Sequence, residues 1–400
     1  MKKIFKYAML FAMACSLTTA MTSCSSNDDD TPQTGQLSEG DKYLQKVLAA
    51  NVDNTINPTY KALADGCEKL NNELEALTPG SITQQQVDNV CKTFLEARAN
   101  YEGSEAFLLG AASHFLIDPH IDSWPLGLNE LYNYLKADHK YKITDQSILG
   151  FHGIEFILFR DGKPRKAAEL NSHDSYNQDG IDFTIFSGTQ ELDYAKAVAE
   201  DLRNSVYRLE CSWDENANKE HVKVLDELET VYKTDKGFSY GYEMKNAGDP
   251  TKSTYNTVKL AVSSVLTGDN SAGGIADEVG NTKINNPFSG KDESYIESPY
   301  SYNSLTDFQN NIHSIENVWF GGVEGKRGEY SFHNYFKKYD AKVGQRVETA
   351  ISDALKQIAA IKYPFVKNIK DPQCKNAIKA CQELNDALAA ASDFVGKNNK

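Results

Sequence analysis

The apolar run GFHGIE at 150–155 contains a histidine and a carboxylate, His152 and Glu155, three residues apart. If this run is helical, both side chains leave the same face, because residues i and i+3 are neighbours on a helix surface. An imidazole beside a carboxylate is half of a metal site. The run continues with the apolar residues FILF at 156–159, where an unpartnered carboxylate is costly. We therefore expect Glu155 to pair with a cation or a hydrogen-bond donor.

Apolar residues recur at helical spacing along most of the chain. Helices are expected around His152 and over the ranges 41–77 with a break near Pro58, 81–116, 191–213 with an extension to 232, 255–266, 305–320, 340–361 and 371–395. Residues 160–188 are expected to form a loop or small hairpin, and 267–303 a long irregular segment. The sequence therefore predicts an all-α fold of two packed helical bundles, 40–187 and 188–400, with long irregular loops.

The first 23 residues have the layout of a bacterial signal peptide. Three lysines precede an apolar segment over 7–17 that is too short to span a bilayer, and small residues lead to Cys24. This layout resembles a lipoprotein signal, in which Cys24 is lipidated after cleavage, and the acidic linker 24–39 resembles a surface-export tag. We expect an outer-membrane lipoprotein of the bacterial cell envelope, on the periplasmic or the surface side. The plainer alternative is a cleaved signal and a soluble periplasmic protein.

The charge balance is acidic. Residues 1–23 hold three lysines and no acid, so the remainder has 39 basic and 56 acidic residues, a net charge of about −17. Such a chain is a poor partner for nucleic acid or for an anionic membrane surface. We therefore expect no nucleic-acid partner.

Five cysteines follow Cys24, and no two have C-x-x-C spacing, which argues against a cysteine metal site. Cys67 and Cys91 lie on successive expected helices and could form a disulfide. Cys374 and Cys381 are two helical turns apart, roughly 10 Å, which exceeds the reach of a disulfide.

Further motifs lie on both sides of the GFHGIE run. They are VDNTINPTY at 52–60, RANYEGSEAFLLG at 98–110, DSWPL at 122–126, ESPYSYNSLTDF at 297–308 and NVWFG at 317–321. Together with Gly150-x-His152-x-x-Glu155, they resemble the motifs of the imelysin-like family, whose signature is G-x-H-x-x-E. That family includes iron-regulated envelope lipoproteins and was named for a reported peptidase, peptidase M75. The chain has Ser304 where the family pattern leads us to expect threonine.

The resemblance implies two helical bundles with the His152 and Glu155 face turned to a groove at their junction. Residues of the matching motifs are then expected to gather in this groove. The predicted metal ligands are His152, Glu155 and Glu105, and the predicted supporting or ligand-binding residues are Asp122, Arg98, Ser301 and Asp307. Imidazole and carboxylate ligands suit iron, manganese and zinc; iron is the predicted ion and zinc the alternative.

Each of these residues also has a plainer role. His152 and Glu155 could be a packing or hydrogen-bonded pair, and Arg98 a buried counter-charge. Glu105 could pair with Arg98 or Arg160. Asp122 could cap a helix or form a turn, and Ser301 and Asp307 could cap the helix near Leu305. Two nearby histidines, His114 and His120, could be extra ligands.

Three functions fit these observations. The first is an envelope lipoprotein that binds an iron ion or an iron chelate in the groove during iron uptake, beside separate partner proteins. The second is a metallopeptidase of the imelysin type. The peptidase motifs H-E-x-x-H and H-x-x-E-H each need a second histidine, and Phe156 follows Glu155 instead, so an enzyme is the less favoured prediction. The third is a surface adhesion module without metal.

Overall fold

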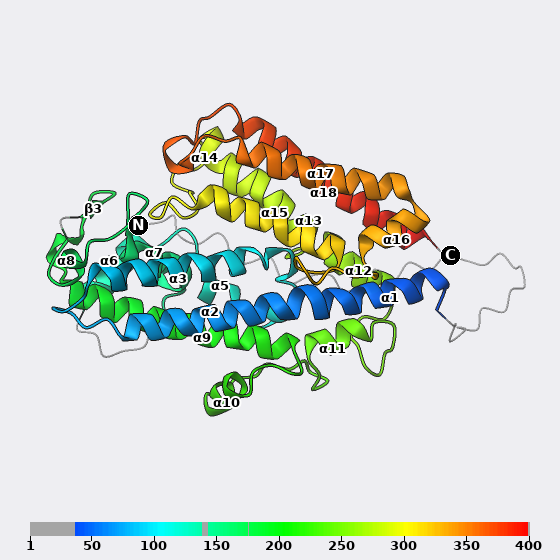
Figure 1. The fold of residues 1–400 in the computed structure, drawn as a ribbon, viewed down its shortest axis with the longest axis horizontal. Helices are drawn as coiled ribbons and strands as arrows, with labels where there is room; N and C mark the ends of the chain where they lie inside the picture. Colours follow the sequence, from blue (N-terminus) through cyan, green and yellow to red (C-terminus); the bar gives the residue numbers. More distant parts are fainter. Residues whose placement is uncertain (1–36, 138–142, 175, 399–400) are drawn as a thin grey trace, which may run out of the picture. The chain divides into compact units, whose positions relative to one another are not determined.

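The computed structural model describes residues 37–137, 143–174 and 176–398, which are mostly helical. Figure 1 shows the helices in sequence colours. The predicted signal peptide 1–23, the lipidation site Cys24 and nearly all of the acidic linker 24–39 lie outside the described residues. The all-α prediction is confirmed for the part of the chain that the structure describes.

The α-helices up to residue 213 are α1 (Glu39–Asn51), α2 (Asn57–Glu75), α3 (Gln84–Glu102), α4 (Ala111–His114), α5 (Asp118–Ile121), α6 (Leu128–Lys136), α7 (Gly150–Leu158), α8 (Ala167–Leu170) and α9 (Gly188–Trp213). They are followed by α10 (Lys219–Glu227), α11 (Tyr240–Lys245), α12 (Val258–Thr267), α13 (Ala272–Asp277), α14 (Asn285–Ser289), α15 (Ser304–Phe320), α16 (Phe332–Tyr339), α17 (Ala341–Ala359) and α18 (Cys374–Lys397).

Shorter elements connect these helices. Two π-helical segments are η1 (Val52–Ile56) and η5 (Glu278–Ile284), and the 3₁₀ segments are η2 (Glu105–Phe107), η3 (Gln146–Ile148), η4 (Phe183–Ile185) and η6 (Phe365–Lys367). Two small antiparallel hairpins pair β1 (Phe159–Arg160) with β2 (Lys163–Pro164) and β3 (Asn177–Gln178) with β4 (Ile181–Asp182). Apart from Phe159 at the start of β1, both hairpins lie in the range 160–188, where the sequence predicted a loop or small hairpin.

Local sequence signals explain where several helices begin. Thr83 caps α3 and Ser187 caps α9, and each forms a capping box with a glutamine three residues on. The predicted break near Pro58 is the π-helical η1, which joins α1 to α2. A proline has no N–H to donate and its ring crowds the preceding turn, so a wider turn before Pro58 accommodates it.

The helices pack in two neighbouring groups. α2 packs against α3 and α9, and α9 also contacts α7. α17 and α18 lie side by side, and α18 also contacts α12 and α13 (Figure 1). α15 packs against both α17 and α3 and so joins the groups. Residues 38–400 form a single contact unit, and the division of the bundles at residue 188 stays a prediction.

Two expectations differ from the structure. The range 267–303 was expected to be irregular, yet it contains α13, η5 and α14. These pieces are short and rich in glycine and asparagine, so they lack the apolar period that marks a longer helix. Cys67 and Cys91 are both buried and unbridged, as are the other three cysteines of the described chain.

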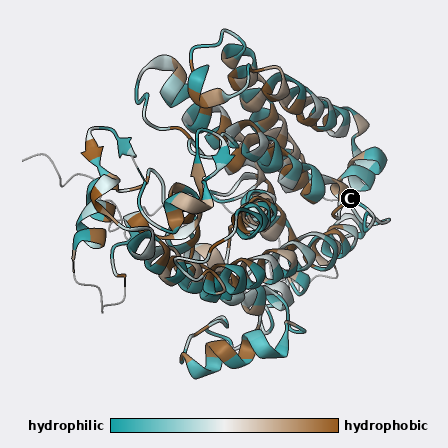
Figure 2. Cartoon of the chain, turned by 60° about the vertical axis from the view of Figure 1, so that its left-hand side comes forward, coloured by the Kyte–Doolittle hydropathy of each residue, from teal (hydrophilic) through white to brown (hydrophobic). Residues whose placement is uncertain are grey.

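The longer helices are amphipathic, and in Figure 2 they carry both hydrophilic and hydrophobic residues. α18, for example, buries Leu384, Leu388 and Val395 almost completely. Within the described residues, no helix is both long enough and apolar enough to cross a bilayer.

We predict that Leu384→Ala lowers the free energy of unfolding by about 2–5 kcal/mol, because it leaves a cavity between packed helices. Urea unfolding followed by circular dichroism measures this loss. The matched control is Leu260→Ala on α12, where the leucine is 52% exposed and the expected change is within about 0.5 kcal/mol. Equal losses in the two variants would contradict the assigned core.

Candidate metal centre

The short helix α7 holds the His-x-x-Glu pair, and all nine of its residues are buried. It begins at Gly150, whose φ is +79° and whose position leaves no room for a side chain, because an added Cβ would lie 2.2 Å from the carbonyl oxygen of Ile121. A glycine is therefore needed here. This close approach brings the chain at Asp122 beside the first turn of α7, and so beside His152.

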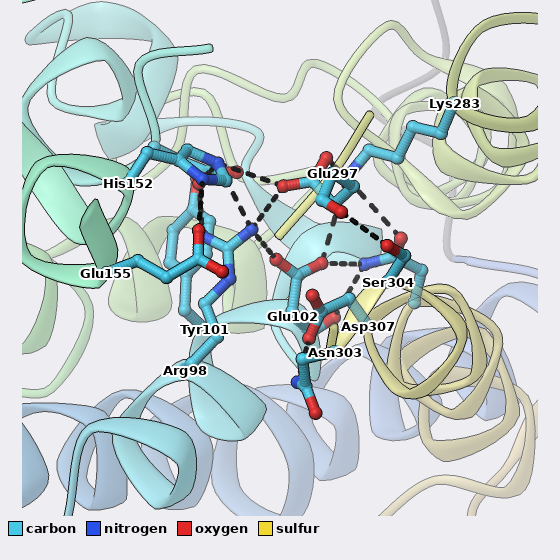
Figure 3. Close-up of polar contacts among 12 residues, drawn as sticks. Arg98, Tyr101, Glu102, His152, Glu155, Lys283, Glu297, Asn303, Ser304 and Asp307 are labelled. Atoms are coloured by element: carbon cyan, nitrogen blue, oxygen red, sulfur yellow. Dashed lines mark hydrogen bonds and ion pairs between the residues drawn. The ribbon is translucent and has the colours of Figure 1, made fainter. Parts of the chain in front are cut away.

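Two carboxylates from distant parts of the sequence meet at one nitrogen of His152. Its Nε2 lies 2.9 Å from Oδ1 of Asp122 and 2.9 Å from Oε1 of Glu297. All three side chains are at most 8% exposed, and one potential ligand atom from each lies within 4.8 Å of the others. We call Asp122, His152 and Glu297 the inner triad. Figure 3 shows His152 directed toward Glu297.

Glu155 lies at the other nitrogen of the same ring. Its Oε2 is 3.6 Å from Nδ1 of His152. Its Oε1 accepts hydrogen bonds from the backbone N–H of Tyr300 at 3.2 Å, and from the N–H and hydroxyl of Ser301 at 2.7 and 2.6 Å. Glu155 therefore has the donors expected from the sequence. These hydrogen bonds tie α7 to the segment that carries Glu297, whereas Oε2 of Glu155 and Nδ1 of His152 are buried without a hydrogen-bond partner among the described residues.

Arg98 of α3 lies among the carboxylates of this cluster. Its guanidinium contacts Asp122, and its Nη2 lies 2.5 Å from oxygens of both Glu297 and Glu102. The same Nη2 is 3.5 Å from Nε2 of His152. Burial alone would lower the pKa of Arg98, but the surrounding carboxylates raise it well above its ordinary value. Arg98 thus remains charged and is the buried counter-charge that the sequence allowed.

The inner triad holds a strongly polarised set of charges. Burial raises the pKa of Asp122, but Arg98 and His152 outweigh it and hold that pKa well below the usual range. For Glu297, burial is outweighed by Lys283 and His152, and the pKa falls to about 2. Burial lowers the pKa of His152, yet Asp122 raises it well above its ordinary value. Without a bound metal ion, these pKa shifts therefore favour a protonated His152 ring beside the ionised carboxylates of Asp122 and Glu297.

A second group of carboxylates adjoins the inner triad. Carboxylate oxygens of Glu102, Glu105 and Asp122 lie within 4.8 Å of one another, so Asp122 belongs to both groups. We call these three residues the oxygen group. Lys283 neutralises part of its charge, with Nζ 3.7 Å from Glu102 and 3.8 Å from Glu105. Burial raises the pKa of Glu102 and raises that of Glu105 well above its usual value.

The remaining predicted residues lie around this cluster. Ser301 donates to Glu155 rather than capping α15, whose N-cap is Asn303. Asp307 lies in the first turn of α15, is fully buried, and accepts a hydrogen bond from the Asn303 amide at 2.6 Å. Burial raises the pKa of Asp307 well above its usual value. His114 and His120 contact Tyr240 and Asp201 instead of the cluster.

The sequence did not single out three members of the cluster, namely Glu297, Glu102 and Lys283. Glu297 is the first residue of the motif at 297–308, and Glu102 lies four residues after Arg98 on α3. The motif and the helical spacing could therefore have identified both residues as members of the cluster. Lys283 lies on η5, in the range expected to be irregular. Of the three predicted metal ligands, His152 belongs to the inner triad and Glu105 belongs to the oxygen group. Glu155 lies beside Nδ1 of His152 and belongs to neither group.

The donor set fits a transition-metal ion. One imidazole with carboxylates on two sides suits iron, manganese or zinc. The oxygens that would bind the ion are those now contacted by Arg98, so binding requires the guanidinium to release at least one carboxylate.

Phe156 stands where an inverted zinc-peptidase motif needs a histidine. Its side chain is completely buried and packs against the ring of Tyr300, with the ring centroids 5.1 Å apart.

The fold and the site define an all-helical protein with a buried cluster of one imidazole, several carboxylates and two permanent cations. The sequence profile of the imelysin family, peptidase M75, matches residues 56–391. The chain belongs to the imelysin family, which confirms the resemblance found in its motifs.

Two relatives extend over nearly the whole chain. Iron-regulated protein A of Synechococcus elongatus is 23% identical over 353 residues, which cover 88% of this chain and 84% of that protein. The crystal structure of a proposed iron-regulated protein A precursor from Parabacteroides distasonis is similar at a TM-score of 0.74 and 27% identity, covering 90% of this chain and 97% of that one.

We predict that Lys283→Met destabilises the metal-free protein by about 3–5 kcal/mol, because it leaves Glu105 without its ion-pair partner and leaves Arg98 alone to compensate Glu102 and Glu297. Chemical unfolding measures the loss. Lys291→Met, at an exposed position after α14, is the matched control and should change stability by less than about 0.5 kcal/mol. A Lys283 variant as stable as this control would show that the carboxylates are not ionised together.

Proposed function

We propose that this protein binds a metal ion, in the first place iron, at the inner triad of Asp122, His152 and Glu297. The observation that carries the proposal is the convergence of one imidazole nitrogen and two carboxylate oxygens within 4.8 Å in a buried cluster. Buried carboxylates of like charge are costly unless cations lie among them. A metal ion would supply positive charge where Arg98 and the imidazolium now supply it.

The choice of iron rests on two kinds of support. Oxygen and imidazole donors suit ferrous and ferric iron as well as manganese and zinc, whereas thiolates are absent from both groups of ligands. The Synechococcus and Parabacteroides relatives are named as iron-regulated proteins. Zinc, bound by the same groups, is the alternative ion.

Each residue has a distinct part in this proposal. His152 ligates through Nε2, and Glu155, whose Oε2 lies 3.6 Å from Nδ1, moves closer on metal binding and accepts a hydrogen bond from the Nδ1–H. Asp122 and Glu297 each give one oxygen, and Arg98 turns toward Glu102 when the ion takes its place. Glu105, in the oxygen group, is a further candidate ligand.

We further propose an envelope location and a role in iron uptake. Both rest on the N-terminal sequence, which predicts lipidation at Cys24, and on the names of the relatives. In this proposal the lipid anchors the protein to the outer membrane, and separate uptake proteins deliver or receive the iron.

We predict that His152→Ala removes tight Fe²⁺ binding, about one equivalent per chain, with little change in helical content. Anaerobic titration and metal analysis of the purified protein measure the stoichiometry. His313→Ala is a close control, because His313 also precedes a glutamate by three residues and contacts Glu316 at 2.8 Å, but it is half exposed on α15. If the two variants bind iron equally, or if the wild-type protein binds none, the proposed site is wrong.

We also predict that binding strengthens as pH rises and releases a proton. The raised pKa of His152 means that the imidazole is protonated at neutral pH, and a metal must displace that proton from Nε2. The logarithm of the binding constant should therefore rise by about one for each pH unit below the folded pKa. Calorimetry in buffers of different ionisation enthalpy measures the protons released, and a release of zero would contradict the assigned ligand.

A further inference from the structure

An acidic cavity of about 600 Å³ lies beside the oxygen group. It is lined by the end of α12, by α13 and η5, and by Glu105. Asp269, Asp277 and Glu278 also line it, and all three are exposed. Among the described residues that line the cavity there is no lysine, arginine or histidine. The cavity therefore presents four carboxyl groups and no fixed positive charge.

Glu105 connects this cavity to the buried cluster. It lines the cavity, although its side chain is only 9% exposed. Its carboxylate accepts no hydrogen bond from any described residue, and the nearest cation is Lys283 at 3.8 Å. Burial raises the pKa of this carboxyl group well above its usual value, so the group favours its protonated form unless a cation lies near it. Its position is explained if a cation passes or rests at the inner end of the cavity.

The contacts continue from Glu105 to His152. The Nζ of Lys283 lies 3.8 Å from Glu105 and 3.5 Å from Oε2 of Glu297, and the other oxygen of Glu297 is 2.9 Å from Nε2 of His152. Asp122 belongs to both the oxygen group and the inner triad. An ion at the inner end of the cavity would thus find oxygen ligands first and the imidazole next. Figure 3 shows Lys283 reaching toward Glu297.

We propose that the cavity is the entrance through which uncomplexed metal cations reach the inner triad, and that it discriminates against anionic iron chelates. The inference rests on the proposed function and adds the class of substrate to it. A cleft lined by charges of one sign concentrates counter-ions and speeds their association. The same field repels a chelate that carries net negative charge. Lys283 closes the inner end of this path and is displaced by the entering ion.

The test uses the double variant Asp277→Asn/Glu278→Gln, which replaces two carboxyl groups of the cavity lining and leaves both groups of buried ligands unchanged. The matched control, Glu215→Gln/Glu220→Gln, removes the same charge from exposed positions at and before α10. The measured quantity is the association rate with Fe²⁺ in stopped-flow competition against a chromogenic chelator, at low salt and at about 0.5 M salt. Ferric citrate serves as the anionic chelate, and His152→Ala is run beside each protein.

The cavity variant should take up Fe²⁺ about three- to tenfold more slowly at low salt, with the difference nearly lost at high salt. The control should keep the wild-type rate, and ferric citrate should load neither protein. Wild-type rates in the cavity variant, or loading from ferric citrate as fast as from Fe²⁺, would overturn the inference. In either case, iron binding that is lost in His152→Ala would still uphold the proposed function. Absence of His152-dependent uptake in the wild-type protein would overturn both.

Discussion

The structure depends on buried cations that balance the negative charge of several carboxylates lying close together. Arg98 lies at the centre and contacts Asp122, Glu297 and Glu102. The compensation is uneven. Asp122 and Glu297 are held ionised around Arg98 and the imidazole, whereas burial raises the pKa of Glu102. The cluster therefore has an ionised inner side and, toward the acidic cavity, a side that takes up protons more readily. The oxygens that are held ionised therefore lie beside the imidazole, on the side away from the acidic cavity.

The fold serves this cluster by bringing four distant segments to one place. α3 supplies Arg98, the turn after α5 supplies Asp122, α7 supplies His152, and the segment before α15 supplies Glu297. No two of these segments hold the site alone. The hydrogen bonds from residues 300 and 301 to Glu155 fasten the last segment to α7, so the loop before α15 is held by the same helix that carries the histidine. The site is therefore formed only when helices from both halves of the sequence have packed.

Sequence reasoning recovered the fold class, most of the long helices and the placement of His152 and Glu155 on one helix, because these depend on local patterns. The period of apolar residues marks α2, α17 and α18, and the GFHGIE run marks α7. It could not say which ring nitrogen of His152 faces which carboxylate, since that depends on how α7 lies against Asp122 and Glu297. Lys283 was missed because η5 is short and has no apolar period of its own. The division into bundles at residue 188 was drawn from composition and stays a prediction; α9, which begins there, packs against α2.

The π-helical segment η5 makes the cluster sensitive to chain length. A π-helical turn holds one residue more than an α-helical turn, and η5 runs from Glu278 at the cavity to just past Lys283 among the buried carboxylates. Deleting one residue between them would let the segment close into an ordinary α-helix with its two ends in nearly the same orientation, whereas an α-helix of unchanged length would turn the ends relative to each other by roughly a quarter turn. In the second case, one of the two side chains would leave its place. In this region the spacing of residues, as much as their identity, is what members of the family would have to share for their sites to be equivalent.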